Sequence, residues 1–449
     1  MTLRSSTSSP TRYAVLGGGA AGLMLAWTLA RAGEKVTLYE RERLPGGLAA
    51  GFKVGEIWLE KFYHHIFKSD RRIIRLIETL GLSDRLVWGH PVSAVLTGGE
   101  EWQLDSAQSL LKFAPLSLAE RLRMAAAMAY LKAEPRATRL EGQTAARWIR
   151  RWMGAGPYRT VWRPLLEGKF GALADDIAAP WFWARVHDRT TALGYLRGGF
   201  QQVYNGLAEG IAGAGGTLRF DTEVTEIRPE PGGGLCVETN DGGQRFDRVI
   251  SCLPTRVTCR LTPALPQRYR QRYDWGQAYG AHCLILTLDR QLTDSYWLNI
   301  SDPGYPFMVL VEHTNYLPPE DYGGRHLVYI GNYRPMDDPI YTKDADTLLS
   351  EYLPHLKRIN PNISREWITE TRAFAAPFAQ PIVTVDYRNH IPPARTPIPG
   401  LFLANMFQVY PHDRGQNYSI DLAERLAQRL LNTPKSSDAA PARPPNSGE

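Results

Sequence analysis

The sequence predicts an α/β fold, and three observations support this prediction. The chain has 449 residues, of which 43% are hydrophobic and 22% are charged, as in a globular protein with two or three lobes and a large core. Near the N-terminus a glycine-rich stretch separates an apolar strand pattern from a helix pattern. A second strand pattern follows that helix, and the order strand, helix, strand is typical of a parallel sheet covered by helices.

The first strand is predicted over residues 13–16, and residues 15–33 contain no acid and a single base near their end. Such a run is compatible with a membrane helix, a signal-peptide core, or the first turn and helix of a nucleotide-binding fold. A membrane span needs about 20 apolar residues, which the run nearly supplies. Glycines crowd its front, however, and a strand precedes it, so we interpret it as strand, glycine-rich turn and helix.

The spacing of the glycines predicts a phosphate-binding turn. Gly17, Gly19 and Gly22 follow the pattern in which one glycine makes the tight turn, one lets the backbone approach a pyrophosphate, and one lets the helix pack on the strand. The N–H groups at the start of the helix then face the phosphates. A second strand is predicted over residues 35–39 and is followed by Glu40. This acid lies 18 residues after Gly22, close to the offset of about 20 at which an acid binds ribose hydroxyls.

A second pair of glycines indicates which dinucleotide is bound. Gly46 and Gly47 follow Glu40 closely, and this extended motif resembles that of the flavin-containing amine oxidase and protoporphyrinogen oxidase superfamily, in which it wraps FAD. In that family the acid holds the adenosine ribose, and the second pair lets the chain run close to the pyrophosphate. The alternative is that residues 45–47 form only a turn.

Other segments that resemble the family lie far apart in the chain, at residues 198–227, 246–254, 399–405 and 415–420. The resemblance therefore implies an α/β fold with a discontinuous Rossmann-type FAD-binding domain and a mixed α+β substrate lobe. The implied FAD-binding parts are residues 11–105, 191–277 and 377–433, the implied substrate lobe has a helical part (106–190) and a β-rich part (278–376), and residues 1–10 and 434–449 are expected to be disordered.

The resemblance also implies which residues contact FAD. They form the two glycine turns, the ribose acid and its neighbour, the adenine-contacting valine, and the start of the helix that caps the flavin. They are Gly17, Gly19, Ala21, Gly22, Glu40, Arg41, Gly46, Gly47, Leu48, Val224, Asn417, Tyr418 and Ser419.

Two adjacent histidines are candidate catalytic residues. His64 and His65 lie in residues 60–67, the passage that reaches the flavin ring in the family. Neighbouring side chains on an extended segment point to opposite faces, so we expect at most one of them to face the pocket. Imidazole titrates near neutral pH and can serve as acid or base, whereas the alternative for either residue is a structural role. A metal site is not expected, because no third ligand stands at a useful spacing.

The C-terminal region adds two further candidates. Tyr418 matches the position of an aromatic wall beside the flavin, and Arg414 is a candidate clamp for a phosphate or carboxylate. Asp413 either pairs with Arg414 or takes part in catalysis. Amine oxidases usually carry a lysine on the strand that leads to the substrate pocket, but residues 279–286 contain none, and His282 is the nearest polar residue. This departure argues against oxygen-driven amine oxidation and leaves desaturation, sugar chemistry and porphyrinogen-type oxidation open.

The helical region carries a charge imbalance that the whole chain hides. Residues 120–170 contain eleven bases and four acids, an excess of +7 that exceeds the +6 of the entire chain, and Trp148, Trp152 and Trp162 are interleaved with the bases. Basic and aromatic helices lie on anionic membranes or bind phosphate groups. The alternative is a solvated basic face over a tryptophan-rich core. The modest charge of the whole chain gives no indication of nucleic-acid binding.

The cellular compartment is inferred from the cysteines and the N-terminus. The four cysteines show no C-x-x-C spacing, so neither a disulfide framework nor a zinc site is indicated, and a reducing compartment fits best. The first ten residues lack the apolar core of a signal peptide. We therefore expect a cytoplasmic protein, and peripheral contact with a membrane is an open alternative.

The leading functional hypothesis is an FAD-dependent oxidoreductase of the amine or protoporphyrinogen oxidase type, which transfers a hydride from a small organic substrate to flavin N5. An anionic substrate is one option under this hypothesis. Two alternatives stay open. One is an FAD-dependent isomerase resembling UDP-galactopyranose mutase, for which basic helices would clamp phosphates. The other is a non-catalytic FAD-binding protein.

Overall fold

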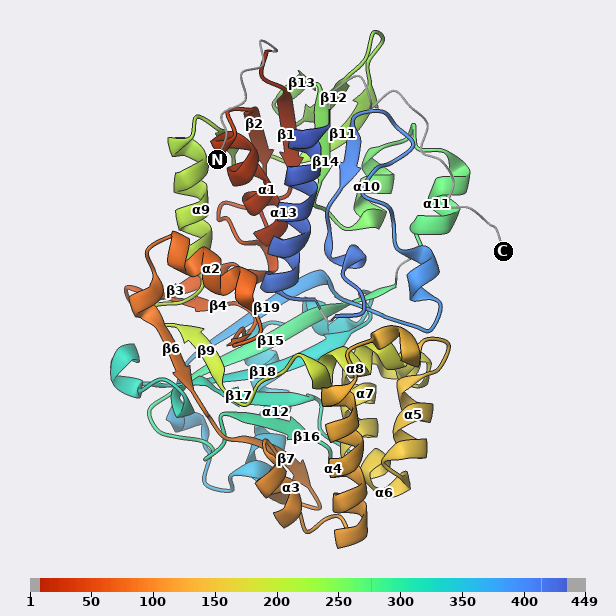
Figure 1. Ribbon diagram of the computed structural model, residues 1–449. Coiled ribbons are helices and arrows are strands. Elements are labelled where there is room, and N and C mark those ends of the chain that lie inside the picture. The colour runs from red at the N-terminus through yellow and green to blue at the C-terminus, as the bar shows by residue number, and fades with distance from the viewer. Residues whose placement is uncertain (1–8, 276, 413, 434–449) are drawn as a thin grey trace.

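The computed structural model describes residues 9–275, 277–412 and 414–433, and it has the predicted α/β fold (Figure 1). A parallel sheet with helices beside it forms the upper part of the view, a large and mostly antiparallel sheet crosses the middle, and a group of helices stands beside that sheet. The two terminal segments expected to be disordered, apart from residues 9 and 10, lie outside the described residues.

Five of the described strands form the parallel sheet. Its central strand is buried along residues 13–16, as expected for a strand covered on both faces. The register sets Leu16 beside Tyr39 and Ser251, and Ser251 beside Leu403, so the carboxyl ends of the strands meet at one edge. In sheet order the strands are β10 (Thr217–Arg219), β2 (Lys35–Tyr39), β1 (Arg12–Leu16), β14 (Arg248–Ser251) and β20 (Leu401–Leu403).

This sheet combines three distant parts of the chain, and Arg248 joins them. Its buried guanidinium donates from Nη1 to the Tyr13 hydroxyl and to the Leu430 carbonyl, each at 3.0 Å. The first strand of the sheet is thereby fixed to the end of the last helix. A smaller antiparallel sheet lies beside this assembly and consists of β11 (Val224–Pro229), β12 (Leu235–Thr239) and β13 (Gly242–Phe246).

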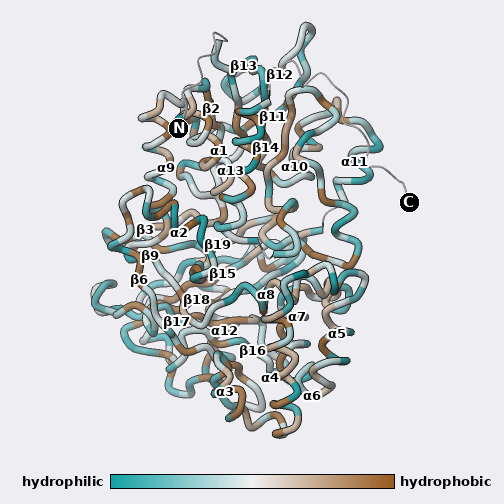
Figure 2. The backbone as a smooth tube through the Cα atoms, viewed as in Figure 1, coloured by the Kyte–Doolittle hydropathy of each residue, from teal (hydrophilic) through white to brown (hydrophobic). Residues whose placement is uncertain are grey.

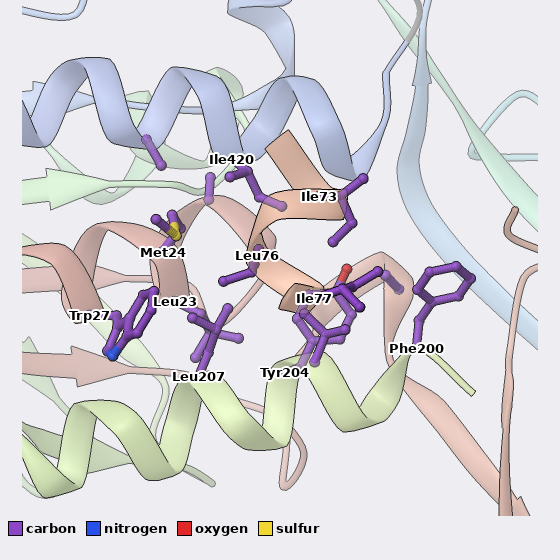
Figure 3. Close-up of a cluster of buried hydrophobic side chains, with 14 of the residues drawn as sticks. Leu23, Met24, Trp27, Ile73, Leu76, Ile77, Phe200, Tyr204, Leu207 and Ile420 are labelled. Carbon is purple, nitrogen blue, oxygen red and sulfur yellow. The ribbon is translucent and has the colours of Figure 1, made fainter. Parts of the chain in front are cut away.

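Helices from four regions of the sequence share one hydrophobic core next to the parallel sheet. Figure 3 shows this core, in which Met24, Leu76, Leu207 and Ile420 point toward one another from four different helices. These helices are α1 (Ala20–Arg31), α2 (Arg71–Thr79), α9 (Gln201–Gly213) and α13 (Gln416–Asn432); α10 (Thr255–Leu261) and α11 (Gln267–Tyr273) lie beside the smaller sheet.

Seven of the described strands form the large sheet. In sheet order they are β19 (Ile368–Pro381), β15 (Ala278–Leu288), β18 (His326–Arg334), β17 (Val309–Glu312), β16 (Trp297–Ile300), β7 (Ser93–Thr97) and β8 (Glu100–Gln103). Helix α12 (Ala345–Ile359) shares a hydrophobic core with this sheet. The described residues also form two short antiparallel sheets. One consists of β3 (Gly51–Val54) and β4 (Ile57–Glu60), and the other, in sheet order, of β5 (Ile66–Phe67), β9 (Leu193–Leu196) and β6 (Leu86–Gly89).

The large sheet departs from the predicted domain boundaries. Strands β7 and β8 lie within the range 11–105 that was assigned to the FAD-binding part, yet β7 pairs in parallel with β16 of the β-rich lobe. Strand β19 likewise continues past residue 376. The physical reason is that the alternation of apolar residues predicts a strand but does not identify the strand that pairs with it.

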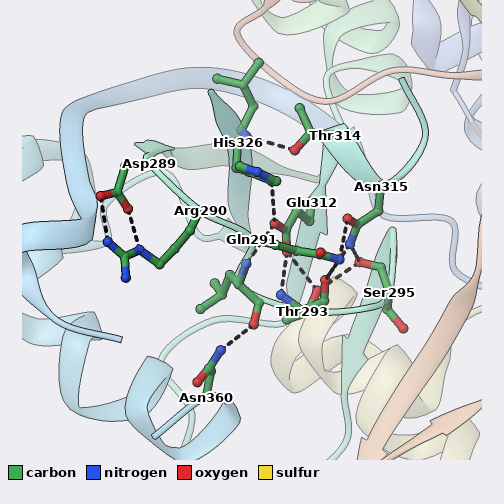
Figure 4. Close-up of polar contacts among 12 residues, drawn as sticks. Asp289, Arg290, Gln291, Thr293, Ser295, Glu312, Thr314, Asn315, His326 and Asn360 are labelled. Atoms are coloured by element: carbon green, nitrogen blue, oxygen red, sulfur yellow. Dashed lines mark hydrogen bonds and ion pairs between the residues drawn. The ribbon is translucent and has the colours of Figure 1, made fainter. Parts of the chain in front are cut away.

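A buried polar network supports two inner strands of the large sheet, β17 and β16. The carboxylate of Glu312 accepts hydrogen bonds from the backbone N–H groups of Leu292 and Thr293 at 2.9 and 2.6 Å, and from the Thr293 hydroxyl at 3.0 Å (Figure 4). Burial raises the pKa of Glu312 to about 7. These bonds tie the loop before β16 to the end of β17.

The helical group has its own core, which contains most of its tryptophans. Trp148, Trp162, Trp181 and Trp183 are buried, whereas Trp152 is 51% exposed. The helices are α3 (Ala107–Lys112), α4 (Leu118–Ala133), α5 (Ala145–Trp152), α6 (Ala155–Pro157), α7 (Arg163–Phe170) and α8 (Ala179–His187). Among the described residues, no helix is long and apolar enough to cross a membrane, and no cluster of side chains is arranged to hold a metal ion.

Candidate active site

A cavity of about 990 Å³ extends from the carboxyl edge of the parallel sheet to the large sheet and the helical group. Its walls contain every residue that was predicted to contact FAD or to act in catalysis. These are Gly17, Gly19, Ala21, Gly22, Glu40, Arg41, Gly46, Gly47, Leu48, Val224, Asn417, Tyr418 and Ser419, together with His64, His65 and Arg414. The structure thus brings the candidates together, and their individual roles stay predictions.

The first glycine turn has the geometry that its spacing predicts. The Gly17 N–H donates to the Tyr39 carbonyl at 2.8 Å, with Gly17 at a φ of +101°. A Cβ at Gly22 would lie 1.9 Å from the Gly17 carbonyl oxygen, so only glycine lets the helix pack this closely on the turn. A Cβ at Gly19, in contrast, would meet only the Cα of Gly47, at 4.0 Å. Gly19 therefore leaves open space in front of the N-terminus of α1.

The second glycine pair packs against the first turn. The Gly46 N–H donates to the Gly18 carbonyl at 2.8 Å, and Gly19 and Gly46 form an isolated parallel bridge. A Cβ at Gly47, which has a φ of +57°, would lie 3.1 Å from the Cα of Gly19. The pair is thus more than a surface turn, because it closes one side of the space in front of α1.

Glu40 stands beside the glycine turn. Its carboxylate accepts hydrogen bonds from the backbone N–H of Gly18 at 2.6 Å and from that of Glu42 at 2.9 Å. A Cβ at Gly18 would approach the Glu40 side chain to 3.0 Å. The sequence pattern assigns no role to Gly18, although its small size lets the acid reach the turn.

Glu40→Ala is expected to weaken FAD binding by about 1.5–3 kcal/mol, the usual contribution of hydrogen bonds to a charged acceptor. The measurement is the dissociation constant of FAD after removal and re-addition of the flavin. Glu56→Ala is the matched control, because the side chain of Glu56 is 99% exposed and does not line the cavity. An unchanged FAD affinity in Glu40→Ala would rule out the ribose assignment.

Both candidate histidines line the cavity, which differs from the expectation that at most one would face it. Residues 61–65 bend and are not part of a strand, so the alternation of side chains that holds in a strand does not apply. His64 Nδ1 contacts the Phe62 carbonyl, and His65 Nδ1 lies 3.2 Å from the Tyr296 hydroxyl. Burial lowers the pKa of His64 to about 4 and that of His65 to about 3. Both imidazoles are therefore neutral at pH 7.

Tyr418 belongs to a cluster that the sequence does not reveal. Asp188, at the end of α8, accepts hydrogen bonds from the Tyr418 hydroxyl at 2.9 Å, from His412 Nδ1 at 2.6 Å and from His187 Nδ1 at 3.0 Å. The ring of His412 stacks on that of Tyr418 with centroids 4.4 Å apart. Burial raises the pKa of Asp188, but the hydrogen bonds more than offset this and leave the pKa below its usual value. The side chain of Tyr418, which is predicted to form the aromatic wall, is thus held by the carboxylate of Asp188.

Two other C-terminal candidates are bonded to protein groups. Arg414 donates from Nη1 to the Gln380 side-chain carbonyl at 2.6 Å and from Nη2 to the Tyr333 hydroxyl at 2.7 Å. The side-chain oxygen of Asn417 accepts the backbone N–H of Arg72 at 2.8 Å, at the start of α2. Asp413 lies outside the described residues.

Four cationic side chains contribute to the wall formed by the helical group and the C-terminal region, namely Lys169, Arg185, Arg189 and Arg414. Lys169 comes from α7 and is only 7% exposed; its ammonium lies 5.3 Å from the Trp181 ring and 5.6 Å from the Tyr333 ring. The lysine at the cavity therefore comes from helix α7 and not from the strand of residues 279–286, where amine oxidases usually carry one. His282 of that strand also lines the cavity, and burial lowers its pKa to about 4.

The buried carboxyl of Glu60 links the segment that contains the two histidines to the start of α9. Glu60 is 1% exposed and accepts the Tyr195 hydroxyl and the Phe200 N–H, each at 2.7 Å. Burial raises the pKa of Glu60 to about 7 from an ordinary value of 4.5. The folded state thus favours the protonated carboxyl, and the stability that this gives is lost as the pH rises from about 4.5 to about 7.

Glu60→Gln is expected to stabilise the protein by about 3 kcal/mol at pH 8 and by almost nothing at pH 4.5, since each pKa unit corresponds to about 1.4 kcal/mol. The amide can accept from Phe200 and donate to the Tyr195 oxygen, so both partners stay satisfied. Urea unfolding at the two pH values measures the difference. Glu60→Ala removes the acceptor for Tyr195 and Phe200 and should destabilise the protein at both pH values. Equal stability of Glu60→Gln and the native protein at pH 8 would contradict the raised pKa of Glu60.

Comparisons with known proteins agree with this site. The family model of flavin-containing amine oxidoreductases matches residues 20–412. A local match of 37% identity over 78 residues, 17% of this chain and 16% of the relative, connects the chain to the 15-cis-phytoene desaturase of Synechococcus elongatus.

Several solved structures share the fold. A provisionally assigned protoporphyrinogen oxidase from Exiguobacterium sp. 255-15 has a TM-score of 0.76 and 17% identity, over 95% of this chain and 100% of that one. A reduced UDP-galactopyranose mutase has a TM-score of 0.75 and 15% identity, over 96% of this chain and 97% of that one. Putrescine oxidase bound to putrescine has a TM-score of 0.71 and 16% identity, over 95% of this chain and 100% of that one. The predicted resemblance, fold class and oxidoreductase class are confirmed, and the chain belongs to the flavin-containing amine oxidoreductase family.

Proposed function

We propose that this protein is an FAD-dependent oxidoreductase that oxidises a small organic substrate bearing an anionic group. The observation that carries the proposal is a single cavity that connects a dinucleotide-binding turn to two neutral histidines and four cationic side chains. Family membership supports a flavin, and the two glycine turns with Glu40 support FAD in particular.

The residues fit the cofactor. The open space at Gly19, bounded by Gly47 and facing the free N–H groups of α1, suits a pyrophosphate. Glu40 and Val224 both line the cavity, which supports the proposal that they contact the adenosine, and the cavity volume is at the upper end of the range of about 300–1,000 Å³ that is usual for ligand sites. When bound, FAD would supply a two-electron acceptor.

The side chains at the other end of the cavity define what the protein contributes. His64 and His65 are neutral at pH 7, so either can accept a proton from a substrate but neither is charged as an acid. The Arg414 guanidinium is held in a set orientation by Gln380 and Tyr333, and a planar guanidinium matches the geometry of a carboxylate or phosphate. Tyr418, held by Asp188, can support the substrate from the side.

The charges favour an anion over an amine. Near the histidines the described lining residues include Lys169, Arg185, Arg189 and Arg414 but only two carboxylates, Asp70 and Asp188. Asp188 is occupied by three hydrogen bonds, and Asp70 accepts the Phe67 N–H at 2.8 Å, with a pKa that burial raises to about 6. The described lining thus contains more cationic than carboxylate side chains at this end, which supports an anionic substrate over an ammonium one.

The same wall favours a second candidate, an isomerase that acts on a nucleotide sugar. Guanidinium and ammonium groups bind phosphates well, and the fold is shared with a reduced UDP-galactopyranose mutase. The two candidates differ in whether the reaction consumes an electron acceptor.

The deciding experiment is anaerobic absorption spectroscopy of the purified protein. We expect a flavin spectrum that is bleached by carboxylate- or phosphate-bearing hydride donors and not by simple amines, and that recovers when an electron acceptor is added. Conversion of UDP-galactopyranose only with pre-reduced protein would identify the isomerase instead. A flavin spectrum that no donor bleaches, without isomerase activity, would leave a non-catalytic FAD-binding protein.

A further inference from the structure

One face of helix α4 is apolar although it points to solvent. Leu118 and Leu122 are 61% and 54% exposed, and Ala126, Ala129 and Ala133 are exposed as well. Their spacing of four, four, three and four residues places them along a single stripe of the helix. The opposite face buries Met124, Ala127 and Leu131 in the core of the helical group. Helix α4 is therefore apolar on two sides, and only one of them packs against other described residues.

Exposed large hydrophobic residues concentrate around this stripe. Of the seven in the part of the chain that the structure describes, five belong to the helical group: Leu111, Leu118, Leu122, Tyr130 and Trp152. Leu111 is joined to α4 because its carbonyl accepts a hydrogen bond from Arg121 at 2.7 Å. Tyr130 and Trp152 stack on each other with centroids 6.2 Å apart. Single exposed apolar residues are common in soluble proteins, but a gathering of this kind marks an interaction surface. We call these five residues and the three alanines the α4 face.

Cations border the α4 face on both sides. Arg121 and Lys132 lie along one edge of the helix and Arg123 along the other, as the helical repeat requires. All three donate to backbone carbonyls: Arg121 to Leu116, Arg123 to Trp152, and Lys132 to His187. Carbonyl partners leave a positive charge uncompensated, and none of the three forms an ion pair with a carboxylate of the described residues. The acid of α4, Glu120, caps its N-terminus through Ser117.

Further cations extend this border. Arg147 and Arg151 are exposed on the neighbouring helix α5, whereas Arg150 of the same helix donates to the Tyr158 hydroxyl at 2.9 Å and faces Asp175. Part of the basic excess that the sequence shows thus borders the exposed leucines, whereas Arg139 and Arg163 form ion pairs. In Figure 1, α3 and α4 form the lower end of the molecule, and in Figure 2 the tube at this end includes hydrophobic residues, coloured brown.

We propose that the α4 face docks on an anionic lipid surface, with α4 parallel to the membrane plane. The leucines enter the boundary between headgroups and acyl chains, the stacked Tyr130 and Trp152 lie at headgroup level, and the flanking cations contact the anionic headgroups. A second copy of the chain fits less well, because a symmetric contact would bring two sets of cations together without carboxylates to pair with them.

The docking face is connected to the cavity wall. Helix α4 packs against α8, and Lys132 donates to the carbonyls of His187 and Arg189, which flank Asp188. Asp188 and Arg189 both line the cavity. Membrane contact would thus affect helix α8, which contributes to one wall of the cavity. This connection does not depend on which reaction takes place in the cavity.

The test is co-sedimentation of the purified flavoprotein with phosphatidylcholine vesicles that contain no or 30% phosphatidylglycerol. We expect binding to the anionic vesicles that weakens at high salt. Leu118→Glu combined with Leu122→Glu should reduce the bound fraction by roughly tenfold or more, because two side chains lose their transfer into the lipid and two negative charges are added. Arg147→Glu with Arg151→Glu should remove much of the salt-dependent part.

Met336→Glu is the matched control, because Met336 is 40% exposed and lies outside the helical group; it should bind vesicles like the native protein. Retained flavin absorbance and an unchanged melting temperature show that each variant is folded. Three results would overturn the proposal: no binding of the native protein to anionic vesicles, equal binding of the leucine variant, or a change of oligomeric state in the leucine variant by sedimentation velocity, which would identify the face as a contact between copies.

Discussion

Gly19→Val is expected to yield a folded protein that binds no FAD. The backbone at Gly19 has φ −77° and ψ −178°, which any residue adopts, and a Cβ there would meet only the Gly47 Cα at 4.0 Å. A Cβ therefore has room at this position, and the valine side chain is expected to fill the space in front of α1 in which we place the pyrophosphate. The measurements are flavin content after purification, FAD titration, and thermal unfolding without cofactor.

Gly22→Val provides the contrast. Its Cβ would lie 1.9 Å from the Gly17 carbonyl oxygen, so this variant should lose the packing of α1 on β1 and with it the fold of the turn. Loss of FAD in Gly22→Val with loss of stability, and loss of FAD in Gly19→Val without it, would separate cofactor contact from folding. Normal FAD affinity in Gly19→Val would show that the pyrophosphate is not bound at this turn.

Replacement of the histidines is expected to leave FAD bound and to slow its reduction by the substrate. If one of them accepts the substrate proton, His64→Gln or His65→Gln should lower the reduction rate by about 10²–10⁴-fold. Because burial lowers the two pKa values to about 4 and 3, the neutral base persists through pH 5–8. The rate in the native protein should therefore fall only as the pH drops toward 4, provided that the substrate does not titrate in this range. Stopped-flow flavin reduction across pH measures both effects.

His90→Gln is the matched control, since His90 is exposed and does not line the cavity. Tyr418→Ala should also slow reduction by removing the aromatic wall, and it leaves Asp188 with two histidine partners. Loss of flavin from these variants would show structural roles. Unchanged rates in all three cavity variants would remove them from the mechanism and direct attention to Arg414 and His282.

The parts of the site that the sequence predicts are those encoded by short segments. The glycine turn is such a part, because a tight turn, close approach of a pyrophosphate and close helix packing each favour glycine at a fixed spacing, and Gly17, Gly19 and Gly22 have that spacing within six residues. The position of Glu40, the predicted ribose acid, follows from the length of one helix and one strand. Such features depend on local geometry, so their prediction does not need the rest of the fold.

The parts that the sequence does not predict depend on contacts between distant residues. Asp188 and Tyr418 are 230 positions apart, and nothing near either residue indicates the other. Lys169 reaches the cavity from a helix, whereas a lysine was sought on a strand. The pairing of β7 with β16 and the bend that turns both histidines inward are likewise set by tertiary structure, which overrides the local pattern.

The way in which Arg248 joins the parallel sheet has a consequence for the time at which the protein can acquire its cofactor. Strand β1 pairs with β14, more than 200 residues later, and the cavity walls include residues 414–419 at the start of α13. A ribosome that has finished the glycine turn has thus made only a fragment of the site, and the nascent chain must keep its apolar strands from aggregating meanwhile. Cofactor loading is therefore expected only after α13 has emerged from the ribosome and its end has met Arg248.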